Sequence, residues 1–279
     1  GPCHYVTLLH CHHLVFLYGI MKNYLILSIF FITGLTGLAY ELVWIRLLIL
    51  SFGSTQFAIT TVLSTFMAGL ALGSIIFGRV VDKYRFPLRV YAAIEIVLGV
   101  YCVLSPWIFS IAREVYLSLS PATGDTTYHA WFEPVQFMMA FLVLIVPTTL
   151  MGGTLPALVK HLASISGRIG YHTAVPYDVN TLGAVTGCLA TGLFALYYIG
   201  INATVYIAGI IDILAGALLL ALYWKERSVD TVGVPEENSA PILEGGSSRK
   251  KLNYIVISAF TISGFCSLAY EVLWTRVLS

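Results

Sequence analysis

Charged side chains are scarce in this sequence. Asp, Glu, Lys and Arg together make up 10% of the 279 residues, whereas hydrophobic residues make up 58%. An ordinary soluble domain is about 25% charged. So few polar groups cannot cover the surface of a water-soluble globule, which indicates that lipid surrounds most of the chain. The net charge of +1 does not by itself indicate or exclude nucleic-acid binding. Because the basic residues lie in short loops between apolar runs, we expect no nucleic-acid partner.

The motifs of soluble enzymes are also missing. The sequence has no phosphate-binding loop, no HExxH, no GxSxG and no GxGxxG that follows a strand. Its five cysteines form no CxxC pair and lie mostly in apolar runs, which is typical of small buried hydrophobic residues rather than of disulfides or metal ligands. We therefore predict no catalytic residue, no cofactor and no metal site in this chain.

Long apolar runs are what the sequence has in abundance. A helix needs about 20 apolar residues to cross a hydrocarbon core. The fourth run contains Pro147 and Pro156, so we expect its helix to kink or to unwind locally between them. The predicted fold is all-α, a polytopic bundle of transmembrane helices whose six spans cover 24–50, 57–77, 88–111, 134–162, 177–198 and 203–224.

Three segments flank this predicted six-span membrane domain, residues 21–224. Residues 1–20 precede Met21-Lys22-Asn23, which looks like a natural bacterial start, so we expect them to be an upstream or added segment. Residues 225–251 are rich in Pro, Glu, Ser and Gly and are expected to form a cytoplasmic linker. Residues 252–279 begin a seventh helix.

One motif occurs twice. The stretch from Gly34 to Arg46 in the first run returns as the stretch from Gly264 to Arg276 in the last. Both contain Leu-Ala-Tyr-Glu followed by Trp and Arg in the same register. The chain is therefore expected to be built from a duplicated unit, with 252–279 as the first helix of a truncated second repeat.

The basic residues predict an orientation. They fall near the N-terminus and in alternate loops, whereas the opposite loops hold only Arg113. Cytoplasmic loops of membrane proteins carry the excess of Lys and Arg. We therefore place the N-terminus and the 225–251 linker in the cytoplasm, with six spans between them, and expect a multi-pass protein of the plasma (inner) membrane.

Ionisable residues inside the predicted spans are the functional candidates, because a charge at the bilayer centre costs at least ~2.5–3.5 kcal/mol. With a rise of about 1.5 Å per residue, Glu41 lies in the outer half of the bilayer and Arg46 reaches the outer interface. Asp212 and Glu95 lie nearer the middle, where either could partner Arg46 from another helix. Glu41 and its repeat Glu271 either line a cavity or make structural hydrogen bonds. The full set is Glu41, Arg46, Glu95, Asp212, Glu271 and Arg276.

The basic loop between the second and third runs resembles a signature of the major facilitator superfamily, Gly-x-x-x-Asp-(Arg/Lys)-x-Gly-x-(Arg/Lys)-(Arg/Lys). Arg85 stands where that signature has Gly. In the gating interpretation Gly78 permits close helix approach, and Asp82 at a helix end pairs with a neighbouring Arg or a facing helix N-terminus to latch a cytoplasmic gate. The alternative is a loop that only sets topology. The candidate gate residues are Gly78, Asp82, Lys83, Arg85 and Arg89.

Four motifs taken together resemble the fused membrane-transporter/spermidine-synthase family. They are the Gly34–Arg46 stretch with its copy, Phe66–Ser74, Pro147–Pro156 and Asp178–Val185, and the resemblance extends from about residue 26 onward. It implies six helices that form one half of a major-facilitator-like membrane module. In full-length members a cytoplasmic aminopropyltransferase-like domain that binds decarboxylated S-adenosylmethionine follows, and no catalytic residue of that domain has a counterpart here.

Three functions remain open from the sequence. The chain is the membrane module of a spermidine-synthase-like protein, a transporter half that moves a cationic or other small solute, or an anchor without transport. The partners expected are the lipid bilayer and a polyamine or other small solute, and the sequence does not fix an oligomeric state.

Overall fold

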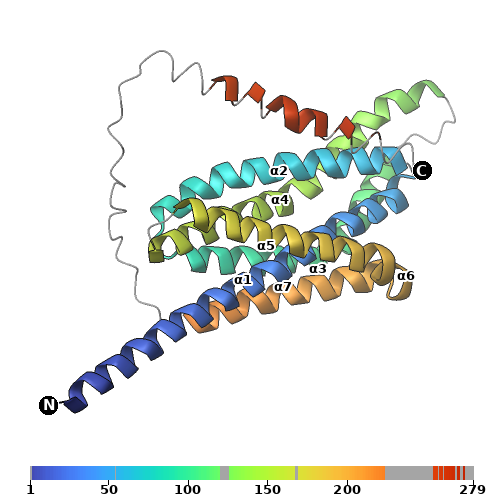
Figure 1. Ribbon diagram of the computed structural model, residues 1–279. Coiled ribbons are helices and arrows are strands. Elements are labelled where there is room, and N and C mark those ends of the chain that lie inside the picture. The colour runs from blue at the N-terminus through green and yellow to red at the C-terminus, as the bar shows by residue number, and fades with distance from the viewer. Residues whose placement is uncertain are drawn as a thin grey trace.

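Every element of the computed structural model is helical (Figure 1). The structure describes residues 2–53, 55–119, 126–166, 169–223, 254–256, 258–259, 261–267, 269–270 and 273. Within the described residues, six helices are long and apolar enough to cross a membrane. The prediction of an all-α polytopic bundle is confirmed. Of the expected seventh helix, the described residues between Tyr254 and Ser267 are helical, and the expected linker 225–251 lies outside the described residues.

The helices follow one another with short connections. The fifth span is a single rod formed by α5, a π-helical turn η1 and the short α6. The first helix already begins at Pro2, and its apolar spanning part is Met21–Ser51. The elements are α1 (Pro2–Phe52), α2 (Thr55–Lys83), α3 (Pro87–Leu119), α4 (Thr126–Ser166), α5 (Ile169–Ala190), η1 (Thr191–Ala195), α6 (Leu196–Tyr198) and α7 (Ile201–Tyr223).

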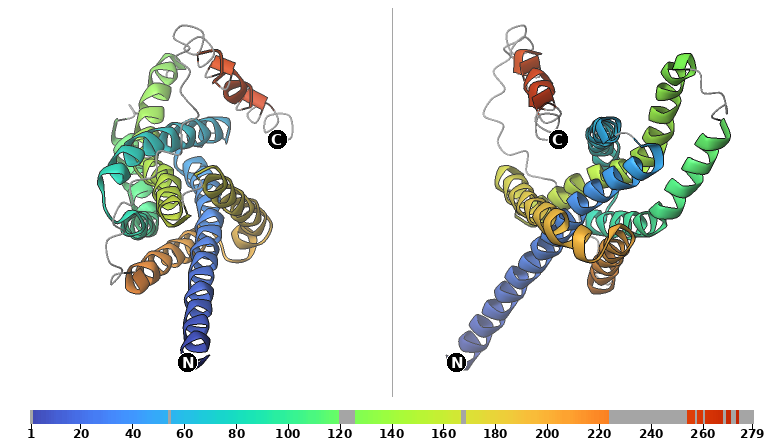
Figure 2. Two further views of the ribbon diagram at one scale, coloured as in Figure 1. Left: turned by 60° about the vertical axis from the view of Figure 1, so that its left-hand side comes forward. Right: turned by 90° about the vertical axis from the view of Figure 1, so that its right-hand side faces the viewer.

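The helices pair across the middle of the chain. The most extensive contacts join α2 to α4, α3 to α7 and α1 to α5, and the next most extensive join α3 to α4 and α1 to α7. Figure 2 shows α1 running through the bundle. These five contacts stay the same set when α1 is exchanged with α4, α2 with α5, and α3 with α7. Because each group has an odd number of spans, the second group runs through the bundle in the opposite direction to the first, which is the arrangement of an inverted repeat.

In each of the three main pairs, the backbones of the two helices approach closely at a glycine. A Cβ on Gly73 of α2 would overlap the carbonyl oxygen of Thr149 on α4, and one on Gly183 of α5 would overlap the carbonyl oxygen of Phe31 on α1. In the third pair, a Cβ on Gly209 would lie 2.9 Å from the carbonyl oxygen of Gly99. Small residues let helix backbones approach closely in membranes, where lipid gives no hydrophobic drive for association.

The local unwinding expected between Pro147 and Pro156 does not occur, because α4 continues through this stretch without a break. Proline lacks the N–H that would bond the carbonyl four residues earlier. The carbonyl of Val143, left free by Pro147, accepts a hydrogen bond of 2.6 Å from the hydroxyl of Tyr101 on α3. Hydroxyl groups that satisfy freed carbonyls make proline tolerable inside membrane helices.

Two apolar cores are separated by a polar layer. The core that we call inner lies toward the α2–α3 loop and includes Phe30 of α1 and Ala92 of α3. The core that we call outer lies toward the opposite end of the bundle and includes Tyr40 of α1 and Leu98 of α3. Asp212 lies between outer-core and inner-core residues of α7. Polar side chains therefore gather at one level of the bundle, on three helices.

Candidate functional site

The polar layer contains a cluster of six side chains that we call the acidic cluster. Its members come from α1, α3 and α7, which pack against one another. Thr33, Thr36 and Tyr40 follow one another at intervals of three and four residues, so that they lie on one side of α1. Tyr91 and Glu95 are four residues apart on α3. The acidic cluster is Thr33, Thr36, Tyr40, Tyr91, Glu95 and Asp212.

Asp212 is the central residue of α7 and has no exposed surface. The hydroxyl of Thr36 donates a hydrogen bond of 2.6 Å to one of its carboxylate oxygens, and the hydroxyl of Tyr40 donates one of 2.6 Å to the other. Lengths of about 2.5–2.7 Å are those of O–H···O⁻ bonds, which are roughly twice as strong as neutral ones. Asp212 therefore ties α7 to α1 at the middle of the bundle.

Glu95 is the second buried carboxyl group, with 1% of its surface exposed. The hydroxyls of Thr33 and Tyr91 are its polar neighbours, and the carboxylate of Asp212 interacts with it electrostatically. The two hydroxyls lie 3.0 Å apart and bond to each other. In the part of the chain that the structure describes, neither oxygen of Glu95 has a partner in hydrogen-bond geometry.

The acidic cluster has no Lys or Arg beside it in the described interior, and the buried His161 lies against Tyr223 among the inner-core residues. Among the side chains that the structure describes, no Lys or Arg is buried. Two carboxylates in an apolar interior are costly unless a positive partner neutralises them. The pair therefore needs either a proton or the positive charge of a ligand.

The structure separates the predicted intramembrane residues into three groups. Glu95 and Asp212 come together, and the groups that bond Asp212 are the hydroxyls of Thr36 and Tyr40 rather than Arg46, one of the partners that the sequence left open. Glu41 is buried on α1, and Arg46, five residues further along the same helix, is exposed. Glu271 and Arg276 lie outside the described residues.

Sequence reasoning missed the hydroxyl groups that hold the carboxyl groups. Thr36 and Tyr40 carry no charge and occur in an apolar run, where Thr and Tyr are common. The signal that could have found them is their helical spacing with Thr33, which marks a polar stripe on a helix that should otherwise be apolar.

The basic loop is the second candidate site. The ammonium group of Lys160 on α4 lies 3.5 Å from a carboxylate oxygen of Asp82, at the end of α2. It also donates a hydrogen bond of 2.5 Å to the carbonyl oxygen of Val81. Asp82 thus pairs with a lysine of another helix, and not with the neighbouring Arg or facing helix N-terminus of the gating interpretation, whereas Lys83 and Arg85 are exposed.

Gly78 does not bring two helices together, contrary to the prediction. Within the described residues, a Cβ on Gly78 would meet no atom within 4 Å. The close approach of α2 to α4 occurs five residues earlier, at Gly73. Arg89, at the start of α3, stacks on the ring of Phe86 at 4.0 Å from its centroid.

Replacing Lys160 by methionine is expected to destabilise the protein more than replacing Asp82 by asparagine. The side chain of Asp82 is 80% exposed, and an exposed ion pair is worth only about 0–1 kcal/mol. Lys160 in addition bonds a carbonyl in the last turn of α2, where a cation is favoured by the helix dipole by about 0.3–1 kcal/mol. Thermal unfolding in detergent measures both, with the exposed Lys83→Met as the matched control. Equal losses for Lys160→Met and Asp82→Asn would contradict the role of the carbonyl.

Comparisons with known proteins identify no relative. No protein-family model, no curated protein and no solved structure matches this chain. The assignment of a function therefore rests on the acidic cluster, the basic loop and the arrangement of the helices.

Proposed function

We propose that this chain is the first six-helix half of a major-facilitator-like membrane protein, with its N-terminus on the cytoplasmic side of the plasma (inner) membrane. The symmetric pairing of α1, α2 and α3 with α4, α5 and α7 supports this, because transporters of that class are built from inverted repeats of three helices. The orientation is supported by the basic residues near one end of α2, α3 and α4, which are Arg79, Lys83, Arg85, Arg89 and Lys160.

The function that the geometry supports best is binding of a cation at the acidic cluster, as part of a secondary-transporter-like cycle. The observation that carries it is the pairing of Asp212 and Glu95, two fully buried carboxyl groups at the level between the two cores. Buried carboxyl groups in membrane spans are the usual groups of proton relays and cation pathways. Asp212 is held by two hydroxyls, and Glu95 offers two oxygens for a positive partner.

Burial limits which cation reaches the acidic cluster in this conformation. Asp212 and Glu95 have 0% and 1% of their surfaces exposed, so a proton fits where a larger solute does not. A polyamine, the cation that the family resemblance suggests, reaches these oxygens only after α1 or α3 moves away from α7. That movement is the opening that alternating access requires.

The second candidate is a membrane anchor for an aminopropyltransferase-like domain, without transport. One observation favours it: the motifs that carry the family resemblance make helix contacts. The backbones of α2 and α4 lie in close contact at Gly73 and Gly152, and those of α5 and α1 at Gly183. These motifs therefore specify a packing arrangement, which an anchor needs as much as a transporter does.

Uptake of labelled putrescine or spermidine into cells that express the full-length protein separates the two. Glu95→Gln keeps the size of the side chain and removes the charge that the cation needs, so we expect uptake to fall at least tenfold. The matched control is Glu114→Gln, the same change at an exposed position of the same helix. Proton movement is followed in parallel with a pH-sensitive dye in proteoliposomes.

Equal movement of polyamine and protons by Glu95→Gln and wild type, at equal protein levels, would contradict the transport proposal. No uptake by the wild type, together with a downstream domain that transfers aminopropyl groups, would favour the anchor.

A further inference from the structure

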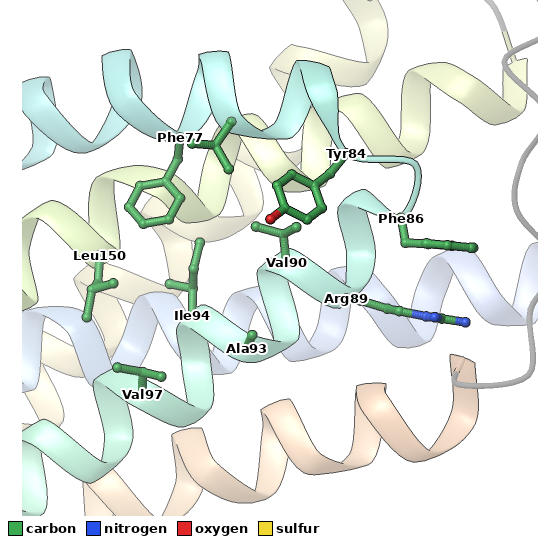
Figure 3. A pocket seen from close by; sticks show the side chains of 10 residues that line it. Phe77, Tyr84, Phe86, Arg89, Val90, Ala93, Ile94, Val97 and Leu150 are labelled. Carbon is green, nitrogen blue, oxygen red and sulfur yellow. The ribbon is translucent and has the colours of Figure 1, made fainter.

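A groove on the outside of the bundle lies between the end of α2 and the start of α3, and none of its lining residues belongs to the acidic cluster. It has a volume of about 520 Å³ and is floored by Leu150 of α4. Figure 3 shows it running from Phe86 and Arg89 at one end to Val97 and Leu150 at the other. Its volume falls within the ~300–1,000 Å³ of small-molecule pockets, and a helix would not fit.

The chemistry of the groove changes along its length. Apolar side chains line its body, whereas the mouth next to the α2–α3 loop is basic and aromatic. The guanidinium of Arg89 is held at this mouth by stacking on the ring of Phe86. Lys83 and Arg85 precede and follow the mouth residue Tyr84 in the sequence and are exposed, and Asp82 is engaged by Lys160. Arg89 therefore places a positive charge at the mouth, and the residues that line the body carry none.

The groove faces outward. Tyr84 at its mouth is 59% exposed, and Val97 at its far end is 53% exposed. From Arg89 to Val97 the groove follows α3 for about 12 Å, at about 1.5 Å per residue. In a bundle whose outer face lies in lipid, such a groove starts at the headgroup level and extends along the acyl chains.

We propose that this groove binds one anionic phospholipid of the leaflet next to the α2–α3 loop. Its phosphate is bound by the guanidinium of Arg89, and one acyl chain lies between Phe77, Ile94 and Leu150. A soluble anion would leave the apolar body unused, and a cationic solute would be repelled at the mouth. Basic pockets between membrane helices on the cytoplasmic side are the sites where anionic headgroups bind. The proposal does not depend on cation binding at the acidic cluster.

Native mass spectrometry of the full-length protein in detergent tests this, with phosphatidylglycerol and phosphatidylcholine of the same acyl chains added in turn. Wild type is expected to retain phosphatidylglycerol more strongly, and Arg89→Gln to weaken this retention about fivefold. Arg113→Gln makes the same change at the opposite end of the same helix and is expected to have no effect. Arg89→Lys keeps the charge and is expected to restore much of the preference.

A second variant tests the body of the groove. Ala93 lines it and is exposed, so Ala93→Trp fills the groove without entering the bundle core, and retention of phosphatidylglycerol is expected to fall as well. Equal retention of phosphatidylglycerol by wild type, Arg89→Gln and Ala93→Trp would overturn the proposal. So would displacement of the lipid by inorganic phosphate at equal concentration, because the headgroup alone would then be the ligand.

Discussion

Gly73→Ala is expected to lower the thermal midpoint of the protein, whereas Gly78→Ala on the same helix is expected to raise it. Alanine favours a helix over glycine by about 1 kcal/mol at both positions. At Gly73 the added methyl group would overlap the carbonyl oxygen of Thr149 and lie 2.8 Å from the Cα atom of Gly152, both backbone atoms of α4. The two helices must move apart, which costs about 1–3 kcal/mol for overpacking and outweighs the gain in propensity.

The pair of variants isolates packing from propensity, because Gly78 offers open space to a Cβ within the described residues. Thermal unfolding in detergent, followed by the fraction that remains monodisperse, measures both midpoints. Gly183→Ala repeats the test at the α1–α5 contact, where the methyl group would overlap the carbonyl oxygen of Phe31. If Gly73→Ala and Gly78→Ala shift the midpoint in the same direction, the close packing of α2 on α4 is not what holds the bundle.

Asp212→Asn is expected to destabilise the bundle by about 1–3 kcal/mol, since one of the two hydroxyls on the carboxylate loses its acceptor. The effect exceeds the ~0.6 kcal/mol average of hydrogen bonds between membrane helices because these bonds are charge-assisted. Thr36 has a second acceptor in the carbonyl of Thr33 at 2.9 Å, so the loss falls mainly on Tyr40. An SDS titration of unfolding measures the free energy.

A double-mutant cycle with Tyr40→Phe gives the pairwise energy. Phenylalanine keeps the stacking on Trp44, whose ring centroid lies 5.7 Å away, and removes only the hydroxyl. A coupling of about 1–2 kcal/mol is expected between Asp212→Asn and Tyr40→Phe. The variant that combines Asp212→Leu, Tyr40→Phe and Thr36→Val is expected to be nearly as stable as wild type, since it removes the carboxylate together with both hydroxyls that bond to it. A coupling near zero would show that the hydroxyls do not hold Asp212.

The architecture was predictable from the sequence because membrane spans follow from local quantities. Length and apolarity need no knowledge of which helices touch. The continuity of α4 was not predictable in this way. The hydroxyl that donates a hydrogen bond in place of the missing Pro147 N–H belongs to Tyr101, on another helix. Local rules describe what proline removes, and only the fold decides what replaces it.

The acidic cluster was predictable in part. Glu95 and Asp212 were identified one by one, because the cost of a charge in lipid depends only on its own position. Their meeting depends on the pairing of α3 with α7, which no local pattern encodes. The same reason explains Gly78 and Gly73, two glycines on one helix of which only one faces a neighbouring backbone.

The hydrogen bond between Thr36 and Asp212 cannot form until α7 has been synthesised. These residues are 176 positions apart in the chain. At about 5–20 residues per second, a ribosome takes roughly 10–35 s to make the chain between them. During that interval the hydroxyl of Thr36 has only the carbonyl of Thr33 as its acceptor, and the hydroxyl of Tyr40 lacks the carboxylate that α7 brings. The contact between α1 and α7 at Asp212 can therefore form only after the last of the six spans has been synthesised.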